Sequence, residues 1–285
     1  MKISDKIAIG ILSLMLAIFV FVASICMIIS NTFFNPDFMV KVLKDRDYYS
    51  IIYSEYCESI EDGISIPAGV DTGVLSSVIS KDRMMSDINS IIYAHYDKNI
   101  DEPSKSLDYD GVKSLFYDTM VTFFTNKGAE LSDEMLSDIM NVASHCSDEY
   151  KGYAEMPFIG TIGSYSRDLD DMFSVISIVC CCLALFLTAL LIFTKKWRSS
   201  VAYTMGISML TAGLLLTVIP AYVLLSNMIS YLRIGIESLY NFAIGYANSF
   251  LLRFVLIGLI FIIIGLIIGF VLFILPSLKR KYKKI

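Results

Sequence analysis

Four uncharged apolar runs dominate the sequence and limit the folds that the chain can adopt. Each run is long enough to cross the hydrocarbon core of a membrane as a helix, which takes about 20 residues. Lipid cannot hydrogen-bond the backbone, so an uncharged run of this length must satisfy its own peptide groups, as a helix does. The sequence therefore predicts an all-α protein built on a four-span transmembrane helix bundle. The runs are residues 7–29, 172–194, 201–225 and 254–275.

The amino-acid composition agrees with a membrane protein and excludes several other classes. Of the 285 residues, 55% are hydrophobic and 18% are charged, whereas an ordinary soluble domain has about 45–50% apolar and about 25% charged residues. Intrinsically disordered chains do not carry this much apolar surface. Six cysteines in a chain of this length are too few for a secreted scaffold held together by disulfides.

The distribution of charge predicts the orientation of the spans. Lys2 and Lys6 precede the first run, and the loop 195–200 and the tail 279–285 carry further Lys and Arg residues. Residues 31–171 instead hold 11 Lys and Arg against 26 Asp and Glu. Because short loops rich in Lys and Arg stay in the cytoplasm, we expect both termini to be cytoplasmic and residues 31–171 to lie outside. We expect the first span to be retained as an anchor, in the plasma membrane of a bacterium.

These boundaries divide the chain into seven segments. The segment between the first two spans is long enough to bury a hydrophobic core of its own. The segments are an N-terminal tail with the first span (1–30), an extracytoplasmic α-helical domain (31–171), the second span with a tight cytoplasmic turn (172–200), the third span (201–225), an outer amphipathic loop helix (226–249), the fourth span (250–278) and a basic cytoplasmic tail (279–285).

Residues 31–171 show helical patterning rather than the alternation of strands. Asn35 and Pro36 are typical of a helix start, and a helical period then continues to a loop with Gly63, Pro67 and Gly69, which predicts a single helix. The last helix of the segment is capped by Ser132 and could also continue into the second span. The other predicted elements are a short helix over 71–80, a helix from 84 to 97, a loop over 98–108, and helices over 110–127 and 132–150.

The loop 226–249 carries apolar residues at heptad spacing, from Ile229 and Leu232 to Tyr246. Polar residues such as Arg233 and Glu237 fall on the opposite side, so the pattern predicts an amphipathic helix. Such a helix could pack on the bundle as a connector or lie in the outer membrane interface.

Small residues mark one face of each of the last two spans. In lipid, small side chains let helix backbones approach closely, so these residues predict helix packing. The contact could lie within the bundle or between two copies of the chain, and the oligomeric state stays open. The helix-packing candidates are Gly258, Gly265 and Gly269 in the fourth span and Ala202, Gly206 and Gly213 in the third.

Two histidines and two cysteines are the remaining candidate site residues. His95 ends a predicted helix, and His145 could pair with Glu149 one turn further on, although a solvated helix face explains these two residues better. Cys57 and Cys146 could form a disulfide in an oxidising compartment. Alternatively, Cys146 belongs to an apolar stripe and could be a reduced thiol in the core.

Several kinds of chemistry have no signal in the sequence. None of the apolar runs contains the ionisable side chains that proton relays and ion-coupled transporters require. The histidines lack the ligand spacing of a zinc site, and Asp168, Asp170 and Asp171 lack the glycine and glutamate of a calcium loop. No phosphate-loop or nucleotide motif occurs, and the acidic segment repels nucleic acid. We expect no catalytic residues, no metal, no cofactor and no nucleic-acid partner.

These observations favour a non-enzymatic cell-envelope protein in contact with membrane lipid. Its acidic helical ectodomain would bind a protein partner or sense an external condition. In layout, with a large outer domain after the first of four spans, the chain resembles ABC permeases of the cell-division and lipoprotein-export type. This resemblance implies, as an alternative, a membrane subunit of a transport or export system, although the short loop 195–200 offers little for an ATPase to grip. A second alternative is a membrane enzyme acting on lipid or wall precursors.

The three interpretations require different features in the structure. Transport requires a polar cavity among the spans, and catalysis requires His95 or His145 beside acidic residues in a cleft. Partner binding predicts an exposed aromatic patch, for which the candidates are Tyr48, Tyr53, Tyr93 and Tyr117.

Overall fold

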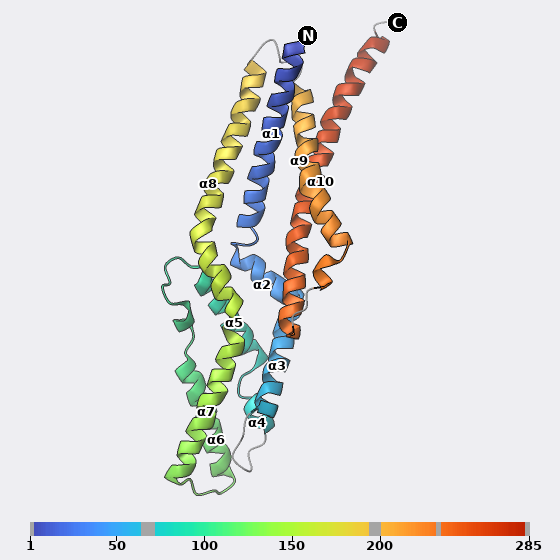
Figure 1. Ribbon diagram of the computed structural model, residues 1–285. Coiled ribbons are helices and arrows are strands. Elements are labelled where there is room, and N and C mark those ends of the chain that lie inside the picture. Colours follow the sequence, from blue (N-terminus) through green and yellow to red (C-terminus); the bar gives the residue numbers. More distant parts are fainter. Residues whose placement is uncertain (1–2, 64–71, 194–200, 232–234, 283–285) are drawn as a thin grey trace. The chain divides into compact units, whose positions relative to one another are not determined.

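The computed structural model describes residues 3–63, 72–193, 201–231 and 235–282, and all regular structure in these ranges is helical. Four of the ten α-helices contain stretches long and apolar enough to cross a membrane (Figure 1). The predicted all-α fold, with four candidate spans and a helical segment between the first two, is confirmed. The candidate spans are Ile7–Ser30, Phe158–Phe193, Val201–Leu225 and Glu237–Val271.

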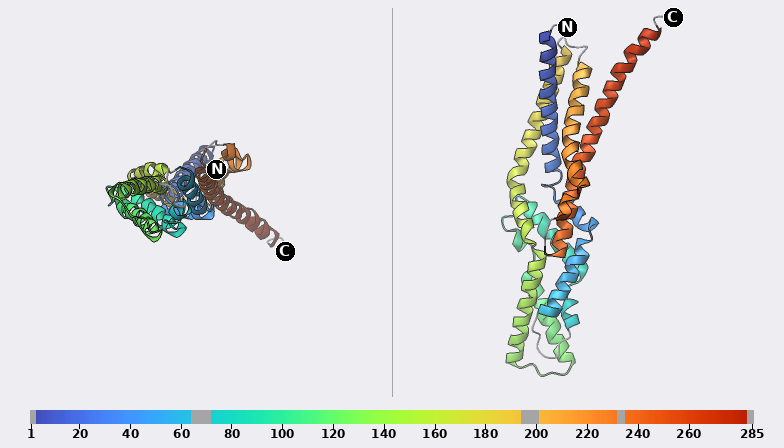
Figure 2. Two further views of the ribbon diagram at one scale, coloured as in Figure 1. Left: turned by 90° about the horizontal axis from the view of Figure 1, so that it is seen from below. Right: turned by 45° about the vertical axis from the view of Figure 1, so that its right-hand side comes forward.

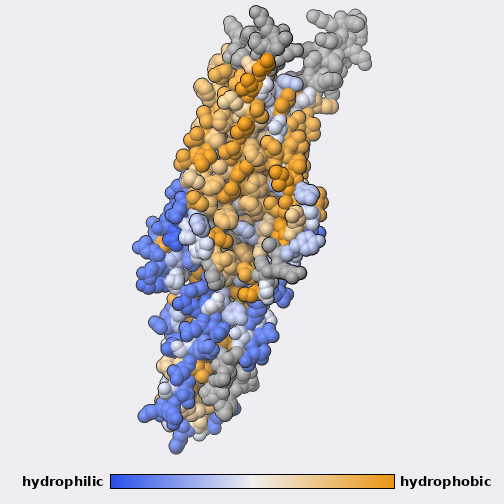
Figure 3. Space-filling view, viewed as in Figure 1, coloured by the Kyte–Doolittle hydropathy of each residue, from blue (hydrophilic) through white to orange (hydrophobic). Residues whose placement is uncertain are grey.

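The chain divides into two compact units. We call Met1–Phe34, Asp168–Arg233 and Ile244–Ile285 the membrane unit, and Asn35–Arg167 with Ile234–Ala243 the helical domain. The helices α8 (Pro157–Phe193) and α10 (Glu237–Tyr282) contribute residues to both. On the face shown in Figure 3, hydrophobic side chains cover the candidate spans and hydrophilic side chains gather over the helical domain. The spans therefore present an apolar surface to lipid, as an integral membrane protein requires.

In the membrane unit, α1 (Ile3–Ser30) packs along α9 (Val201–Leu225), and the right-hand view of Figure 2 shows the two helices side by side. Their contact includes a buried hydrogen bond, because the Ser208 hydroxyl lies 2.8 Å from the carbonyl oxygen of Ser13. On another side of α1, the Ser177 hydroxyl of α8 donates to the carbonyl of Ala23 at 3.3 Å. Hydrogen bonds of this kind add to van der Waals packing in holding helices together in lipid.

The helical domain is built from short helices whose ends follow the capping residues of the sequence. The side chain of Asn35 accepts from the amide of Asp37 at 2.9 Å, and Ser80 and Ser132 cap later helices in the same way. Capping contacts of this type stabilise a helix by about 1 kcal/mol each. The helices are α2 (Pro36–Asp45), α3 (Tyr48–Gly63), α4 (Thr72–Ser76), α5 (Lys81–Tyr96), the 3-10 helix η1 (Pro103–Ser106), α6 (Tyr109–Asn126) and α7 (Asp133–Ala154).

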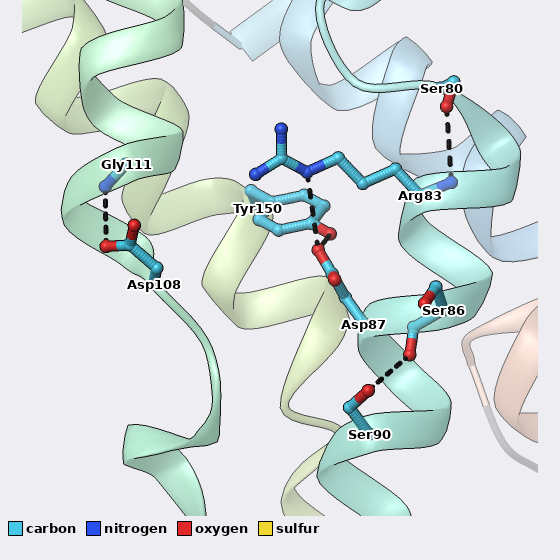
Figure 4. Close-up of polar contacts among 8 residues, drawn as sticks. All are labelled: Ser80, Arg83, Ser86, Asp87, Ser90, Asp108, Gly111 and Tyr150. Carbon is cyan, nitrogen blue, oxygen red and sulfur yellow. Dashed lines mark hydrogen bonds and ion pairs between the residues drawn. The ribbon is translucent and has the colours of Figure 1, made fainter.

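A buried tyrosine joins α7 to α5 in the core of this domain. The Tyr150 hydroxyl donates to a carboxylate oxygen of Asp87 at 2.6 Å, and Arg83 lies one turn away from Asp87 with 3.7 Å between the charged groups (Figure 4). Because the Tyr150 side chain is fully buried, its hydroxyl needs such a partner to avoid a desolvation penalty. The ring packs edge-on against Tyr56, with centroids 5.8 Å apart.

Two stretches that the sequence allows as continuous helices are interrupted in the structure. The single helix predicted from Pro36 divides into α2 and α3 at Asp47, whose φ of 52° belongs to the left-handed region, and a non-glycine residue there ends a helix. The helix from Ser132 does not continue into the second span either. That helix, α7, stops at Ala154, and the new helix α8 begins at Pro157, because the residue before a proline is disfavoured in the helical region.

The loop after the third span also differs from the prediction. The chain forms the 3-10 helix η3 (Met228–Tyr231), and α10 begins at Glu237 and continues without a break through the fourth span. A separate loop helix over 226–249 is therefore wrong, since no proline separates Glu237 from the apolar run that follows. Several predictions lie outside the described residues: those on Pro67, Gly69 and Asp71, on the loop 195–200, on Leu232 and Arg233, and on the end of the tail, 283–285.

Candidate functional site

The described part of the helical domain contains a cleft of about 790 Å³ that could hold a ligand. Its walls come from α3, α7 and the first turns of α8 and α10, and its volume is in the range usual for ligand pockets. Ten of its lining residues are apolar, aromatic or small polar residues, and the others are acidic. The lining residues are Tyr48, Ile52, Glu55, Glu58, Ser59, Asp62, Asp148, Glu149, Gly152, Tyr153, Met156, Phe158, Ile236, Ser238 and Leu239.

The lining contains five acidic side chains and no lysine, arginine or histidine. Glu55, Glu58 and Asp62 share one face of α3, because residues three and seven positions apart project from a helix on the same side. Asp148 and Glu149 face the cleft from α7. The cleft thus concentrates negative charge between two helices, and like charges gathered in a concave surface favour cationic ligands.

Aromatic and aliphatic side chains form most of the rest of the wall, and Phe242, which is not in the lining, packs against two of them. The rings of Phe158 and Phe242 stack with centroids 5.0 Å apart, and Tyr48 meets Phe242 edge-on at 6.0 Å. The Tyr48 hydroxyl donates to the sulfur of Met156. Burial, with a smaller contribution from Glu55, raises the pKa of Tyr48 above its usual range, so its phenol stays protonated and does not act as a base.

The five acidic residues differ in how they are held. The carboxylate of Glu55 accepts from both the amide and the hydroxyl of Ser238, at 3.0 and 2.6 Å, and so connects α3 to the first turn of α10. Glu149 accepts from the Ser59 hydroxyl at 3.1 Å. The other three, Glu58, Asp62 and Asp148, are exposed and have no hydrogen bond or ion pair to any described residue. Their charges are available to a ligand.

Of the residues singled out in the sequence, Glu149 and Tyr48 line this cleft. His145 is exposed on α7, and within the described ranges it makes no ion pair with Glu149. Sequence reasoning missed Glu55, Glu58 and Asp62, although they alternate along α3 with the buried face of Ile52 and Tyr56. The helical period of this segment predicts the buried face, and the acidic face opposite is the signal that could have identified the cleft.

The predicted aromatic patch is not present as a surface. Tyr48 is buried, Tyr53 and Tyr117 are half-buried, and only Tyr93 is largely exposed, with its hydroxyl bound to a carboxylate oxygen of Asp37 at 2.7 Å. The described residues also contain no three His, Cys, Asp or Glu side chains placed to hold a metal ion. The acids of the cleft are therefore spread along its walls instead of converging on one point.

His95 lies at a close contact between α5 and α8, away from the cleft lining. A Cβ atom added at Gly163 would come within 2.8 Å of the His95 carbonyl oxygen, so only glycine allows this approach. Arg167 donates to that carbonyl and to the carbonyl of Ile100, at 2.9 and 2.8 Å. Burial first, and Arg167 second, lower the pKa of His95, while Glu155 opposes them.

This arrangement predicts how the stability of the protein depends on pH. Because the pKa of His95 is lower in the folded chain than in the unfolded chain, its contribution is complete above about pH 6.5, the ordinary pKa of histidine, and is lost as the pH falls further. We expect the melting temperature of the wild type in detergent to fall more steeply between pH 7 and pH 5 than that of His95→Gln. The exposed His145→Gln variant should follow the wild type, and parallel profiles for all three would contradict the assignment.

Cys57 and Cys146 are free thiols in the structure. Cys146 is fully buried on α7, and burial raises its pKa to about 12. Cys57 is half-buried and its thiol lies 3.8 Å from the carbonyl of Ser76, and burial raises its pKa as well. Since the thiolate is the reactive form, both residues are poorly suited to redox or nucleophilic chemistry.

The small residues of the last two spans meet each other within the membrane unit. A Cβ atom at Gly213 would lie 2.7 Å from the carbonyl oxygen of Gly258, and a Cβ atom at Gly265 would lie 2.9 Å from that of Gly206. Gly269, by contrast, has no atom within 4 Å of such a position, and Ala202 is half-buried. The close approach of α9 and α10 therefore uses glycines seven residues apart on each helix and does not involve Gly269.

A second cavity, of about 620 Å³, lies against α9 and α10 in the membrane unit. All the residues that line it are apolar: Leu210, Gly265, Leu266, Ile267, Gly269 and Phe270. None of these side chains offers a polar group to a hydrophilic substrate.

No protein-family model, no curated protein and no solved structure matches the chain. The fold and the apolar spans define the class as a polytopic integral membrane protein.

Proposed function

We propose that this protein is a non-enzymatic component of a bacterial cell envelope, with its termini in the cytoplasm and its helical domain outside, and that the cleft of that domain binds a basic segment of a partner protein. The observation that supports this proposal is the cleft, where five acidic side chains occur without one basic residue.

The composition of the cleft explains why a protein segment fits better than a simple ion. Lys and Arg side chains combine an apolar stem with a charged head. The stem can lie on Ile52, Tyr153 and Phe158, while the head reaches Glu58, Asp62 or Asp148. Aromatic faces add a favourable interaction with such cations. The volume of about 790 Å³ leaves room for several side chains of one segment.

The histidines support the non-enzymatic part of the proposal. Neither His95 nor His145 lines the cleft, and the phenol of Tyr48 is held protonated by burial. Within the described part of the lining, the hydroxyls of Ser59 and Ser238 donate to carboxylates, and no histidine or lysine is present to activate them for nucleophilic attack.

A pair of charge-neutralised variants tests the binding site. In Glu58→Gln/Asp62→Asn/Asp148→Asn, three exposed acids are removed from the cleft, and in Asp101→Asn/Asp118→Asn/Asp138→Asn three exposed acids are removed elsewhere. We expect a fluorescent peptide of alternating Lys and Leu to bind the first variant at least about tenfold more weakly than the wild type, because each lost charge pair contributes about 0.5–1 kcal/mol. The second variant should bind it nearly as the wild type does.

Equal losses in the two triple variants would show that the peptide responds only to net charge, and the proposal would fail. A peptide of alternating Glu and Leu serves as the control for apolar adsorption. All binding is measured by fluorescence anisotropy on the full chain in nanodiscs, at two salt concentrations, because screening weakens charge pairs.

The orientation is tested separately. On a background without native cysteines, Lys105→Cys should react with a membrane-impermeant maleimide on intact cells, because we place residues 31–171 outside. Lys283→Cys should react only after permeabilisation. The reverse pattern would contradict the orientation. It would not bear on the binding site, which the peptide experiment tests.

A further inference from the structure

The end of the third span continues into an exposed apolar strip that leaves the helix. The strip comprises Ile219, Tyr222 and Leu225 at the end of α9, with exposed fractions of 68%, 67% and 85%. Met228 and Tyr231, in η3, follow it with 55% and 80%. One residue in every three thus carries a large exposed side chain, on both sides of the point where α9 stops.

The local backbone explains how the strip continues through the end of the helix. Asn227 has a φ of 51°, and its left-handed conformation ends α9 directly before η3. A 3-10 helix has three residues per turn, so residues three apart lie above one another. Met228 and Tyr231 therefore form one edge of η3, and the exposed polar residues Asn227 and Ser230 precede them on a different edge. The turn has an apolar edge and a polar edge.

A large apolar strip facing water would be costly, whereas scattered exposed apolar residues are ordinary. Here the strip is continuous with α9, and the exposed apolar face of a span contacts lipid. We infer that η3 lies in the membrane interface at this end of α9, with Met228 and Tyr231 inserted among the lipids and Ser230 toward water. The ligand of this surface is the glycerol and upper acyl region of the bilayer itself.

The residue types suit that position. A tyrosine ring is apolar along its body and polar at its hydroxyl, and such side chains gather at the level of the headgroups. Tyr222 and Tyr231 provide two of them on the strip. The backbone of the turn is also partly satisfied internally, because the amide of Ser230 donates to the carbonyl of Asn227 at 3.0 Å. This anchor is independent of the acidic cleft and of the orientation of the chain.

A tryptophan scan with depth-dependent quenchers tests the inference. The sequence has one tryptophan, Trp197, so Trp197→Phe supplies a silent background. Tyr231→Trp and Met228→Trp are reconstituted separately in phosphatidylcholine vesicles brominated at acyl carbons 6,7 or 11,12. Phe186→Trp and Met140→Trp, each reconstituted in the same kinds of vesicle, serve as references. Phe186 is 63% exposed within the second candidate span, and Met140 is 41% exposed on α7 of the helical domain.

We expect Tyr231→Trp and Met228→Trp to be quenched at least twofold more by bromine at carbons 6,7 than at 11,12. Phe186→Trp should be quenched more by the deeper bromine, and Met140→Trp by neither. Ser230→Trp is the matched control, one residue away on another edge, and aqueous iodide should quench it at least twofold more than Tyr231→Trp.

Two results would overturn the inference. If iodide quenched Tyr231→Trp and Met228→Trp as strongly as Ser230→Trp, the turn would lie in water. If neither iodide nor brominated lipid quenched them, protein would cover the strip, as in an association of two copies. Two tryptophan positions in the strip are used so that the test does not depend on one variant that fails to fold. Far-ultraviolet circular dichroism measures the helix content of each variant.

Discussion

Replacing Gly265 with leucine is expected to destabilise the membrane unit by about 3 kcal/mol, the upper end of what overpacking costs a close-packed interior. A Cβ atom at this position would lie 2.6 Å from Cγ of Leu210 and 2.9 Å from the carbonyl oxygen of Gly206. The first neighbour is a side chain that can move, but the second is backbone. To accept leucine, α9 and α10 must separate, and the packing that holds helices together in lipid is then lost.

Gly269→Leu is the matched control, because it introduces the same side chain one helical turn further along α10. A Cβ atom at Gly269 meets nothing within 4 Å, so we expect its melting temperature in detergent to stay close to that of the wild type. The measurement is thermal unfolding of the full chain, followed by circular dichroism. Equal destabilisation by the two variants would mean that leucine acts through something other than the contact with Gly206.

Replacing Glu55 with alanine is expected to destabilise the helical domain by about 3 kcal/mol. The change removes two hydrogen bonds to a carboxylate, which stabilise more than neutral ones do, and leaves their donors unsatisfied. Both donors belong to Ser238, which is only 3% exposed. The amide of Ser238 is also one of the first in α10, where a helix has no internal acceptor to offer.

Glu58→Ala provides the comparison for Glu55→Ala. Glu58 lies on the same helix and lines the same cleft, but it is exposed and makes no polar contact with a described residue, so its removal should change stability by less than about 0.5 kcal/mol. Hydrogen exchange on the full chain adds a local measurement. Amides at the start of α10 should exchange faster in Glu55→Ala than in the wild type, and at the wild-type rate in Glu58→Ala. Wild-type exchange rates in both variants would show that Glu55 does not hold this helix.

These two glutamates illustrate the limit of sequence reasoning for the candidate site. Glu55 and Glu58 are equivalent in a helical pattern, and both precede the same loop. They differ only because Ser238, 183 residues further along the chain, hydrogen-bonds to Glu55. The cleft has the same origin, since its walls combine α3 and α7 with residues 236–239. No local pattern contains information about which distant segments will form one concavity.

The glycines of the last two spans also separate what the sequence predicts from what the tertiary structure decides. Small residues at regular spacing predict that helices approach closely, because this follows from side-chain size alone. Which glycines of α10 contact α9 depends on where the two helices cross. Gly258 and Gly265 contact α9, and Gly269 does not.

The sequence by itself determined the class of the protein and the boundaries of most helices. Uncharged runs of sufficient length have no other stable form in lipid than a helix, and caps such as Asn35, Ser80 and Ser132 act on amides two or three residues away. The tertiary structure decided the partners of Glu55 and Gly265 and the existence of the cleft. The physical reason is range: backbone propensity, capping and hydrophobicity act within a few neighbouring residues, whereas a concave site arises when segments far apart in the chain pack together.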